Sequence, residues 1–187
     1  MRGLFPSVRL KTGITALVRR RLFAYYKSPN RIGGFIAVHY FAYGSNMNWP
    51  QMQRRCPSSR FVCVGRLPGY HFAITRHSRL RNCGTANVCP APGKEVWGIV
   101  YDTSDADLLI LDGFEDGYSR EILPVYPLEE GKPPLDALVY VAAVEENVPH
   151  PSAEYRRLIL EGAKHWKLPA AYLALLEAIQ IEAEKAL

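Results

Sequence analysis

The sequence predicts an α+β fold in which a small mixed β-sheet, barrel-like in form, is flanked by helices. Short runs rich in β-branched and aromatic residues recur through the middle of the chain, with turn signals between them. Helical periodicity is strongest in the C-terminal tail. The length of 187 residues suits one domain with a sizeable core. Strands in the middle and helices at the end therefore favour a barrel-like sheet with helices packed around it.

The strands are expected where these β-branched and aromatic runs occur. Pro68-Gly69 and the run from Pro90 to Gly93 are turn signals that should separate neighbouring strands. The expected ranges are 35–42, 61–66, 69–75, 85–89, 95–101, 121–126 and 136–143.

Helices are expected where capping residues precede apolar residues at helical spacing. Proline is also well tolerated in the first turn of a helix. The predicted helix starts are Asn48 to Pro50, Thr103 or Ser104, Ser152, and Leu168-Pro169.

Residues 1–38 form a basic N-terminal extension that differs from the rest of the chain. They contain eight Lys and Arg and no Asp or Glu, and a basic amphipathic helix is possible near 14–26. Three interpretations stay open: an organelle transit peptide, a tail that contacts RNA or membrane, and an extension of little consequence. The folded domain is expected over 39–187. The cytoplasm is the expected location unless this extension directs the protein to an organelle.

The charge distribution argues against nucleic acid as a partner of the main domain. The chain has 23 Lys and Arg against 18 Asp and Glu, but only 15 of the basic residues lie in 39–187, where the net charge is −3. A surface that follows a phosphate backbone needs a basic face. No apolar run approaches the roughly 20 residues of a membrane-spanning helix. We therefore expect no nucleic-acid partner and no membrane span.

Neither the cysteines nor the histidines indicate a metal site. The four cysteines form no Cys-x-x-Cys pair, and the five histidines lack the spacing of metal ligands. Free thiols of this kind are typical of a reducing compartment. No metal and no cofactor are expected.

The run from Tyr40 to Met47, Tyr-Phe-Ala-Tyr-Gly-Ser-Asn-Met, joins an aromatic strand to the start of a helix. Backbone N–H groups at a helix start lack intrahelical partners and attract anions, and Gly44 allows a ligand to approach the backbone. The same residues also suit a plain strand-to-helix turn. Ser45 is not part of a Gly-x-Ser-x-Gly motif, so it is not expected to be a nucleophile.

A second candidate is the run from Leu111 to Tyr118, Leu-Asp-Gly-Phe-Glu-Asp-Gly-Tyr, in which three carboxylates flank glycines and aromatic residues. Like charges and apolar rings raise the pKa of a carboxyl group, which is what a general base near neutral pH needs. A solvated acidic turn is the alternative interpretation.

Together, residues 43–47 and 111–115 resemble the γ-glutamyl cyclotransferase family, including its AIG2-like relatives. Further stretches resemble the family in the same order, and the similarity covers roughly 39–180: these are 65–70, 84–88, 92–93, 96–98, 137–141, 151–155 and 162–163. The resemblance implies an enzyme that converts a γ-glutamyl compound to 5-oxoproline, releases an amine and needs no cofactor.

The resemblance also assigns site residues. It makes Glu115 the general acid/base, and it implies a substrate-binding set of Tyr40, Phe41, Ala42, Tyr43, Gly44, Ser45, Asn46 and Tyr155. Tyr140 is a weaker candidate, for which an ordinary strand tyrosine with its hydroxyl at the surface is preferred. Asp116 stands where many relatives carry glycine, so it is either a solvated acid or a group that raises the pKa of Glu115 further.

The expected small-molecule substrate is a γ-glutamyl amino acid or peptide, with a γ-glutamylamine as the alternative. A non-catalytic small-molecule binding module of the same fold is a further alternative. The last alternative is an RNA- or membrane-associated role for the basic extension. The protein is expected as a monomer or a homodimer.

Overall fold

The computed structural model describes residues 30–32 and 35–181. The expected basic helix near 14–26 lies outside the described residues. Within them, six strands form one sheet: β1 (Asn30–Ile32), β2 (Phe35–Ala42), β3 (Arg60–Ser78), β4 (Cys83–Ser104), β5 (Tyr118–Pro127) and β6 (Leu135–Ala142).

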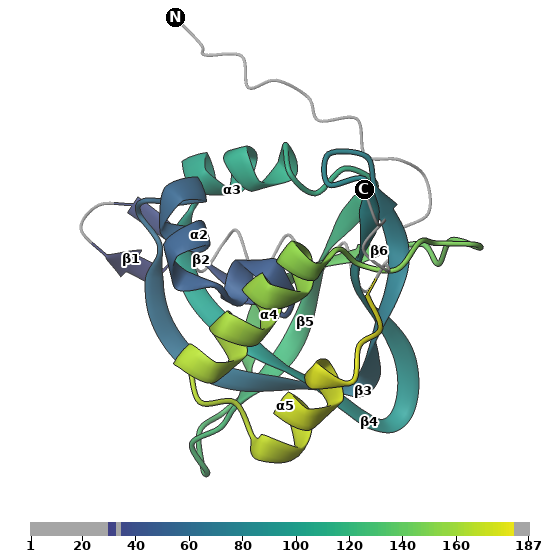
Figure 1. The fold of residues 1–187 in the computed structure, drawn as a ribbon. Coiled ribbons are helices and arrows are strands. Elements are labelled where there is room, and N and C mark those ends of the chain that lie inside the picture. Colours follow the sequence, from purple (N-terminus) through teal and green to yellow (C-terminus); the bar gives the residue numbers. More distant parts are fainter. Residues whose placement is uncertain (1–29, 33–34, 182–187) are drawn as a thin grey trace, which may run out of the picture.

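The sheet closes into a mixed barrel (Figure 1). Its strand order is β1-β2-β4-β3-β5-β6, and β2 pairs in addition with β6. That closing contact, with Tyr40 opposite Leu138, is parallel, whereas the other pairings are antiparallel. The predicted barrel-like mixed sheet is thereby confirmed. The sheet also reaches upstream of residue 39, where the domain was expected to begin, because β2 starts at Phe35 and pairs with β1.

The prediction of separate strands at 61–66 and 69–75, and at 85–89 and 95–101, was wrong. Each pair is one long strand, β3 or β4, and the two turn signals lie opposite each other in the β3–β4 hairpin. The register passes from Pro68–Glu95 to Tyr70–Pro90, so the extra residues form a bulge and not a turn. Gly69 and Gly93 accommodate it with φ values of +80° and +79°. A bulge bends and twists its strand, which lets this hairpin curve around the barrel.

Three of the four helices in the described residues begin directly after the predicted capping residues, whereas the last begins at Ala170, with Pro169 as its N-cap and not in its first turn. The four helices are α2 (Trp49–Arg55), α3 (Asp105–Asp112), α4 (Ala153–His165) and α5 (Ala170–Glu177), together with a short 3-10 turn, η1 (Ser45–Met47). Side-chain oxygens of Asn48, Ser104 and Ser152 accept N–H groups of the first turns of α2, α3 and α4 at 3.0–3.2 Å. None of the helices in the described ranges is long and apolar enough to cross a membrane.

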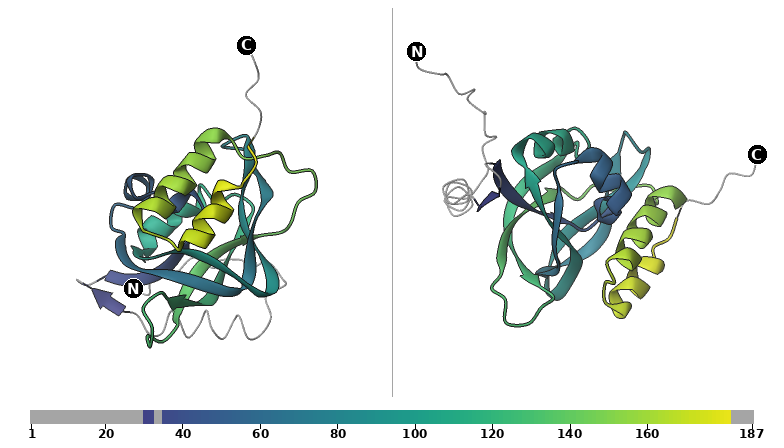
Figure 2. Two further views of the ribbon diagram at one scale, coloured as in Figure 1. Left: turned by 60° about the horizontal axis from the view of Figure 1, so that its bottom comes forward. Right: turned by 90° about the vertical axis from the view of Figure 1, so that its left-hand side faces the viewer.

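The helices cover the barrel in two places. Figure 2 shows α4 and α5 side by side along one side of it, and Figure 1 shows α3 across one end. Strand and helix residues share one core, in which Phe41, Tyr101, Leu111 and Ile159 are fully buried. The helix α4 lies directly on η1, so the position of η1 depends on how closely α4 can approach it.

Gly162 determines how closely α4 approaches η1, and its substitution tests this packing directly. A Cβ atom at this position would lie 2.5 Å from the carbonyl carbon of Met47 and 2.7 Å from the Asn48 nitrogen. We expect Gly162→Ala to lower the free energy of unfolding by about 1–3 kcal/mol, because backbone atoms cannot yield as a side chain can. Urea denaturation measures the change. Helix propensity alone predicts the opposite, a gain of up to about 1 kcal/mol, and a gain would contradict this packing.

Candidate active site

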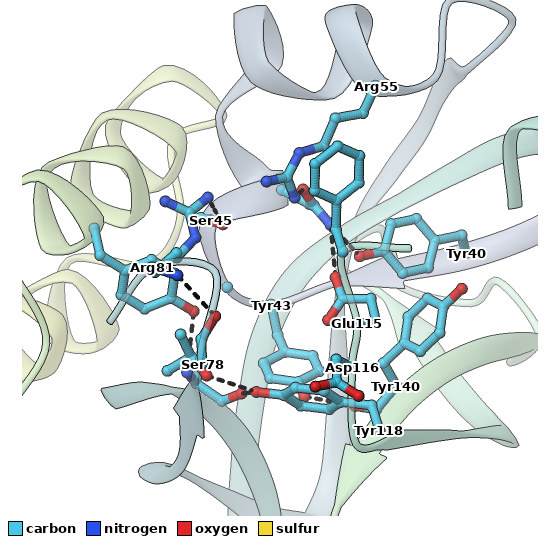
Figure 3. Close-up of a pocket in the computed structure, with 16 residues that line it drawn as sticks. Tyr40, Tyr43, Ser45, Arg55, Ser78, Arg81, Glu115, Asp116, Tyr118 and Tyr140 are labelled. Carbon is cyan, nitrogen blue, oxygen red and sulfur yellow. Dashed lines mark hydrogen bonds between the residues drawn. The ribbon is translucent and has the colours of Figure 1, made fainter. Parts of the chain in front are cut away.

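One cavity gathers residues from nearly every part of the barrel. The space in it that the centres of water-sized molecules can occupy is about 50 Å³. Figure 3 shows Glu115 among the lining residues, with Arg55 and Arg81 to one side and Tyr118 and Tyr140 to the other. The lining consists of Tyr40, Tyr43, Gly44, Ser45, Asn46, Arg55, Ser78, Arg81, Thr85, Ala86, Phe114, Glu115, Asp116, Tyr118, Tyr140 and Tyr155.

The η1 segment forms one wall because β2 ends directly before it. Ser45 and Asn46 are buried there, although both are polar. Gly44 allows the neighbouring wall to come close, since a Cβ atom at this position would lie 3.2 Å from the Tyr155 hydroxyl oxygen. The predicted strand-to-helix run is thus a wall of the cavity.

Asn46 connects this wall to the carboxylate of Glu115. Its Nδ2 donates to Glu115 Oε1 at 3.2 Å and to the Tyr40 hydroxyl at 2.9 Å. Its Oδ1 accepts from Arg55 Nη1 at 2.8 Å and from Gln51 Nε2 at 3.2 Å. With both ends of the amide engaged, the side chain is fixed in one orientation.

Glu115 has the electrostatic setting of a proton carrier. It is partly buried in the loop after α3. Burial raises the pKa of its carboxyl group to about 7, although Arg55, Arg81 and the Asn46 hydrogen bond all act to lower it. Nearby Asp112 adds to the rise. A carboxyl group of this pKa can both accept and return a proton near neutral pH.

Asp116 has a different position from its neighbour. Its carboxylate is 75% exposed and lies 3.9 Å from Arg76 Nη2. The raised pKa of Glu115 is therefore caused mainly by burial of its carboxyl group. The acidic neighbour that adds to it is Asp112, not Asp116.

Two arginines at the cavity were not predicted from the sequence. Arg55 of α2 lies over the Phe114 ring, 4.0 Å from its centre. Arg81, in the turn between β3 and β4, donates to Gln51 Oε1 at 2.9 Å and to Ser45 Oγ at 3.3 Å, and lies 5.0 Å from the centre of the Tyr155 ring. Neither belongs to a motif, so only the fold reveals that they converge. Two fixed cations beside one carboxylate favour an anionic ligand.

The tyrosines of the lining divide into two groups by what their hydroxyls do. Three donate to the protein: Tyr43 to the Tyr140 carbonyl at 2.5 Å, Tyr118 to the Ala86 carbonyl at 2.6 Å, and Tyr140 to Asp112 at 2.8 Å. Tyr140 is therefore buried, and the expectation of a surface hydroxyl was wrong, because α3 and its Asp112 cover this part of β6.

Tyr40 and Tyr155 form the second group. The Tyr40 hydroxyl accepts from Asn46, and the Tyr155 hydroxyl accepts from the Ala86 N–H at 3.0 Å. Since each hydroxyl accepts in these contacts, its own proton can be donated to another acceptor in the cavity. Burial raises the pKa of Tyr155 to about 12, so this group stays protonated at neutral pH.

Most residues that the resemblance assigned to substrate binding do line the cavity. Phe41 and Ala42 do not, and both are buried in the core at 0% and 1% exposure. Alternation along β2 turns Phe41 away from Tyr40, and Ala42 is enclosed by neighbouring strands. Arg55, Gln51 and Arg81 take part in the site although none was predicted, and Tyr118, the last residue of the predicted run 111–118, also lines the cavity.

The polar groups at this cavity suit an organic anion with hydrogen-bonding groups. Among residues 30–32 and 35–181, no three His, Cys, Asp or Glu side chains converge as metal ligands do. Donors predominate, from two guanidinium groups and two tyrosine hydroxyls, and the partly buried Glu115 carboxylate, whose pKa is raised to about 7, is an acceptor among them.

The raised pKa of Glu115 predicts how stability depends on pH. The folded protein retains this proton up to about pH 7, whereas the unfolded chain releases it near 4.5, so rising pH destabilises the fold between these values. Glu115→Gln lacks this effect. Relative to the wild type, its free energy of unfolding should therefore rise by at most about 3 kcal/mol between pH 5 and pH 8. Urea unfolding of both proteins at the two pH values measures the difference, and a pH-independent difference would contradict the raised pKa.

Comparisons with known proteins agree with this geometry. Residues 40–166 match the family model described as gamma-glutamyl cyclotransferase, AIG2-like. The human and mouse proteins named gamma-glutamylcyclotransferase are 34% and 33% identical over 148 residues, which is 75% of this chain and 78% of each relative. A solved structure named gamma-glutamyl cyclotransferase has a TM-score of 0.73 and 32% identity, and covers 80% of this chain and 92% of that one. The chain therefore belongs to the gamma-glutamyl cyclotransferase, AIG2-like family.

Proposed function

We propose that the protein is a γ-glutamylcyclotransferase, which cyclises the γ-glutamyl group of its substrate to 5-oxoproline and releases the attached amine. The observation that carries the proposal is the Glu115 carboxyl group, whose pKa is near 7 within a cavity of cations and hydroxyl donors. The relatives named above support the same reaction.

The reaction needs one group that moves a proton twice. The Glu115 carboxylate takes a proton from the α-ammonium group of the substrate, and the freed amine attacks the γ-carbonyl carbon. A C–N bond forms in the ring as the carbonyl oxygen becomes an oxyanion. When that intermediate collapses, the original amide C–N bond breaks, Glu115 returns the proton to the leaving nitrogen, and the ring nitrogen gives up its second proton, which the released amine takes up as an ammonium group. No water is consumed, and the overall change is one amide exchanged for another.

The other lining groups hold and polarise the substrate. Tyr155 offers a hydroxyl proton that can stabilise the oxyanion, and a well-placed donor of this kind contributes about 3–4 kcal/mol. Arg55 is bonded to Asn46 and so lies close to Glu115, where it suits the α-carboxylate of the glutamyl group. Folding the flexible glutamyl chain into a ring-like conformation is then the main task of the cavity.

Arg81 favours a leaving group that carries its own carboxylate. Its Nη2 donates to Ser45 Oγ and Gln51 Oε1, and the guanidinium group has further N–H groups that can contact a substrate anion. Arg55 suffices for the α-carboxylate, so Arg81 is a second cation that can contact a carboxylate of the leaving group. Amino acids and peptides carry such a carboxylate and simple amines do not, so γ-glutamyl amino acids and peptides should be better substrates than γ-glutamylamines.

Replacing the proton carrier tests the reaction. Glu115→Gln keeps the size and hydrogen-bonding shape of the side chain but cannot carry a proton at neutral pH. We expect 5-oxoproline release, followed by mass spectrometry with the full-length protein and a panel of γ-glutamyl amino acids, to fall at least about 10²-fold. Circular dichroism should show an unchanged fold. A variant as fast as the wild type would refute the assignment, and binding without turnover by the wild type would favour a binding module.

A matched substrate pair tests the role of Arg81. γ-Glutamyl-alanine and γ-glutamyl-ethylamine differ by one carboxylate, so we expect kcat/KM to favour the former about 10- to 100-fold in the wild type. Arg81→Met should remove most of this preference, whereas exposed Arg79, in the same turn, provides the control Arg79→Met, which should keep it. Equal turnover of both substrates by the wild type would instead indicate a γ-glutamylamine cyclotransferase.

A further inference from the structure

The loop that carries Glu115 ends in a tight turn. Tyr118 N–H donates to the Glu115 carbonyl at 3.0 Å, and Gly117 has a φ of +81°. These are the features of a type II turn over residues 115–118. The carbonyl of the central peptide, that of Asp116, has no partner within such a turn and can accept a hydrogen bond from elsewhere in the protein.

Arg76 of β3 supplies that donor. Its Nε and Nη2 both donate to the Asp116 carbonyl oxygen, at 3.2 and 3.0 Å. The Arg76 side chain is 17% exposed, and its guanidinium group forms an ion pair with Glu145. The planar guanidinium group therefore bridges a carboxylate and a turn carbonyl with several N–H groups at once, which a lysine cannot reproduce.

Glu145 is itself held on the edge of β3. Its Oε2 accepts the His77 N–H at 2.8 Å, and its own N–H donates to the Thr75 carbonyl at 3.0 Å. The partner of Arg76 is thus fixed to the same strand as Arg76. The turn at 115–118 is consequently bonded to an arginine of β3 whose partner Glu145, in the loop after β6, is itself hydrogen-bonded to the same strand.

Gly117 provides a second, independent observation. A Cβ atom at this position would collide with the guanidinium group of Arg76. The arginine therefore packs against the backbone of the turn as well as bonding to it. The positive φ favours glycine at position 117, and a Cβ atom there would in addition force the Arg76 guanidinium group to move.

We propose that Arg76 is a positioning residue that holds Glu115 where it can exchange protons with the substrate. The proposal rests on the proposed role of Glu115 as the proton carrier. Arg76 does not line the cavity, so it acts through the backbone of the turn. Asn46 fixes the carboxylate from one side and Arg76 fixes the main chain from the other.

Kinetics of the full-length protein separate positioning from substrate binding. We expect Arg76→Met to lower kcat about 10²-fold, because proton transfer is sensitive to a displacement of about 1 Å, while KM changes less than about threefold. Arg76→Lys should recover only part of kcat. The control is Arg66→Met, which removes another β3 arginine, paired with Glu95 at 3.2 Å, and should leave kcat unchanged. A wild-type kcat in Arg76→Met, or a loss shown equally by the control, would overturn the proposal.

Amide hydrogen exchange tests the same contact without turnover. The Tyr118 amide should exchange at least about tenfold faster in Arg76→Met than in the wild type, and at the wild-type rate in Arg66→Met and Glu115→Gln. Unchanged exchange in Arg76→Met would overturn the positioning role even if Glu115 proves essential. If no γ-glutamyl compound is turned over by the wild type, the proposed function fails, while the exchange rates still decide whether Arg76 holds the turn.

A double-mutant cycle adds a check on the packing. Gly117→Ala should destabilise the wild type more than it destabilises Arg76→Met, because shortening the arginine side chain removes the collision but not the cost of the positive φ. Equal destabilisation in the two backgrounds would show that Arg76 does not press on the turn, and would overturn the proposal.

Discussion

The hydrogen bond from Asn46 to Glu115, at 3.2 Å, joins two segments that lie 69 residues apart in the sequence. One is the 3-10 turn after β2, pressed against α4 at Gly162, and the other is the loop after α3. Both must be in place before the amide can reach the carboxylate. Closure of the barrel brings these two segments together. The pairing of Tyr40 with Leu138 places β2, which leads into the 3-10 turn, beside β6. The cavity exists because these constraints are met at once.

The chemistry of the site follows from a balance of opposing effects on one carboxyl group. Burial disfavours the carboxylate, while two guanidinium groups and an amide donor favour it. Burial outweighs them, and the pKa settles near 7. Had the cations prevailed, the group would remain a carboxylate with little tendency to hold a proton. Had it been buried without them, it would remain protonated at neutral pH. A proton carrier lies between these limits.

The long β3–β4 hairpin serves the site at several points along its length. Its turn carries Arg81, its paired strands place Arg76 against the Glu115 turn and Ala86 against Tyr155, and its bulge gives it the curvature to wrap around the barrel. Each of these contacts joins the hairpin to a different part of the chain. The positions of the site residues therefore depend on their hydrogen bonds to this hairpin.

The sequence alone was sufficient to determine the fold class, most of the helix starts and two segments that meet at the cavity. Strand composition, caps at Asn48, Ser104 and Ser152, and the runs around Gly44 and Glu115 are local signals, each readable within a few residues. Only the tertiary structure decided that Pro68 and Pro90 lie at a bulge, that Tyr140 is buried, that Arg55 and Arg81 lie near Glu115, and that Arg76 bonds to the turn after it. These outcomes depend on which strands pair and in which register, and no local pattern encodes a contact between residues that only closure of the barrel brings together.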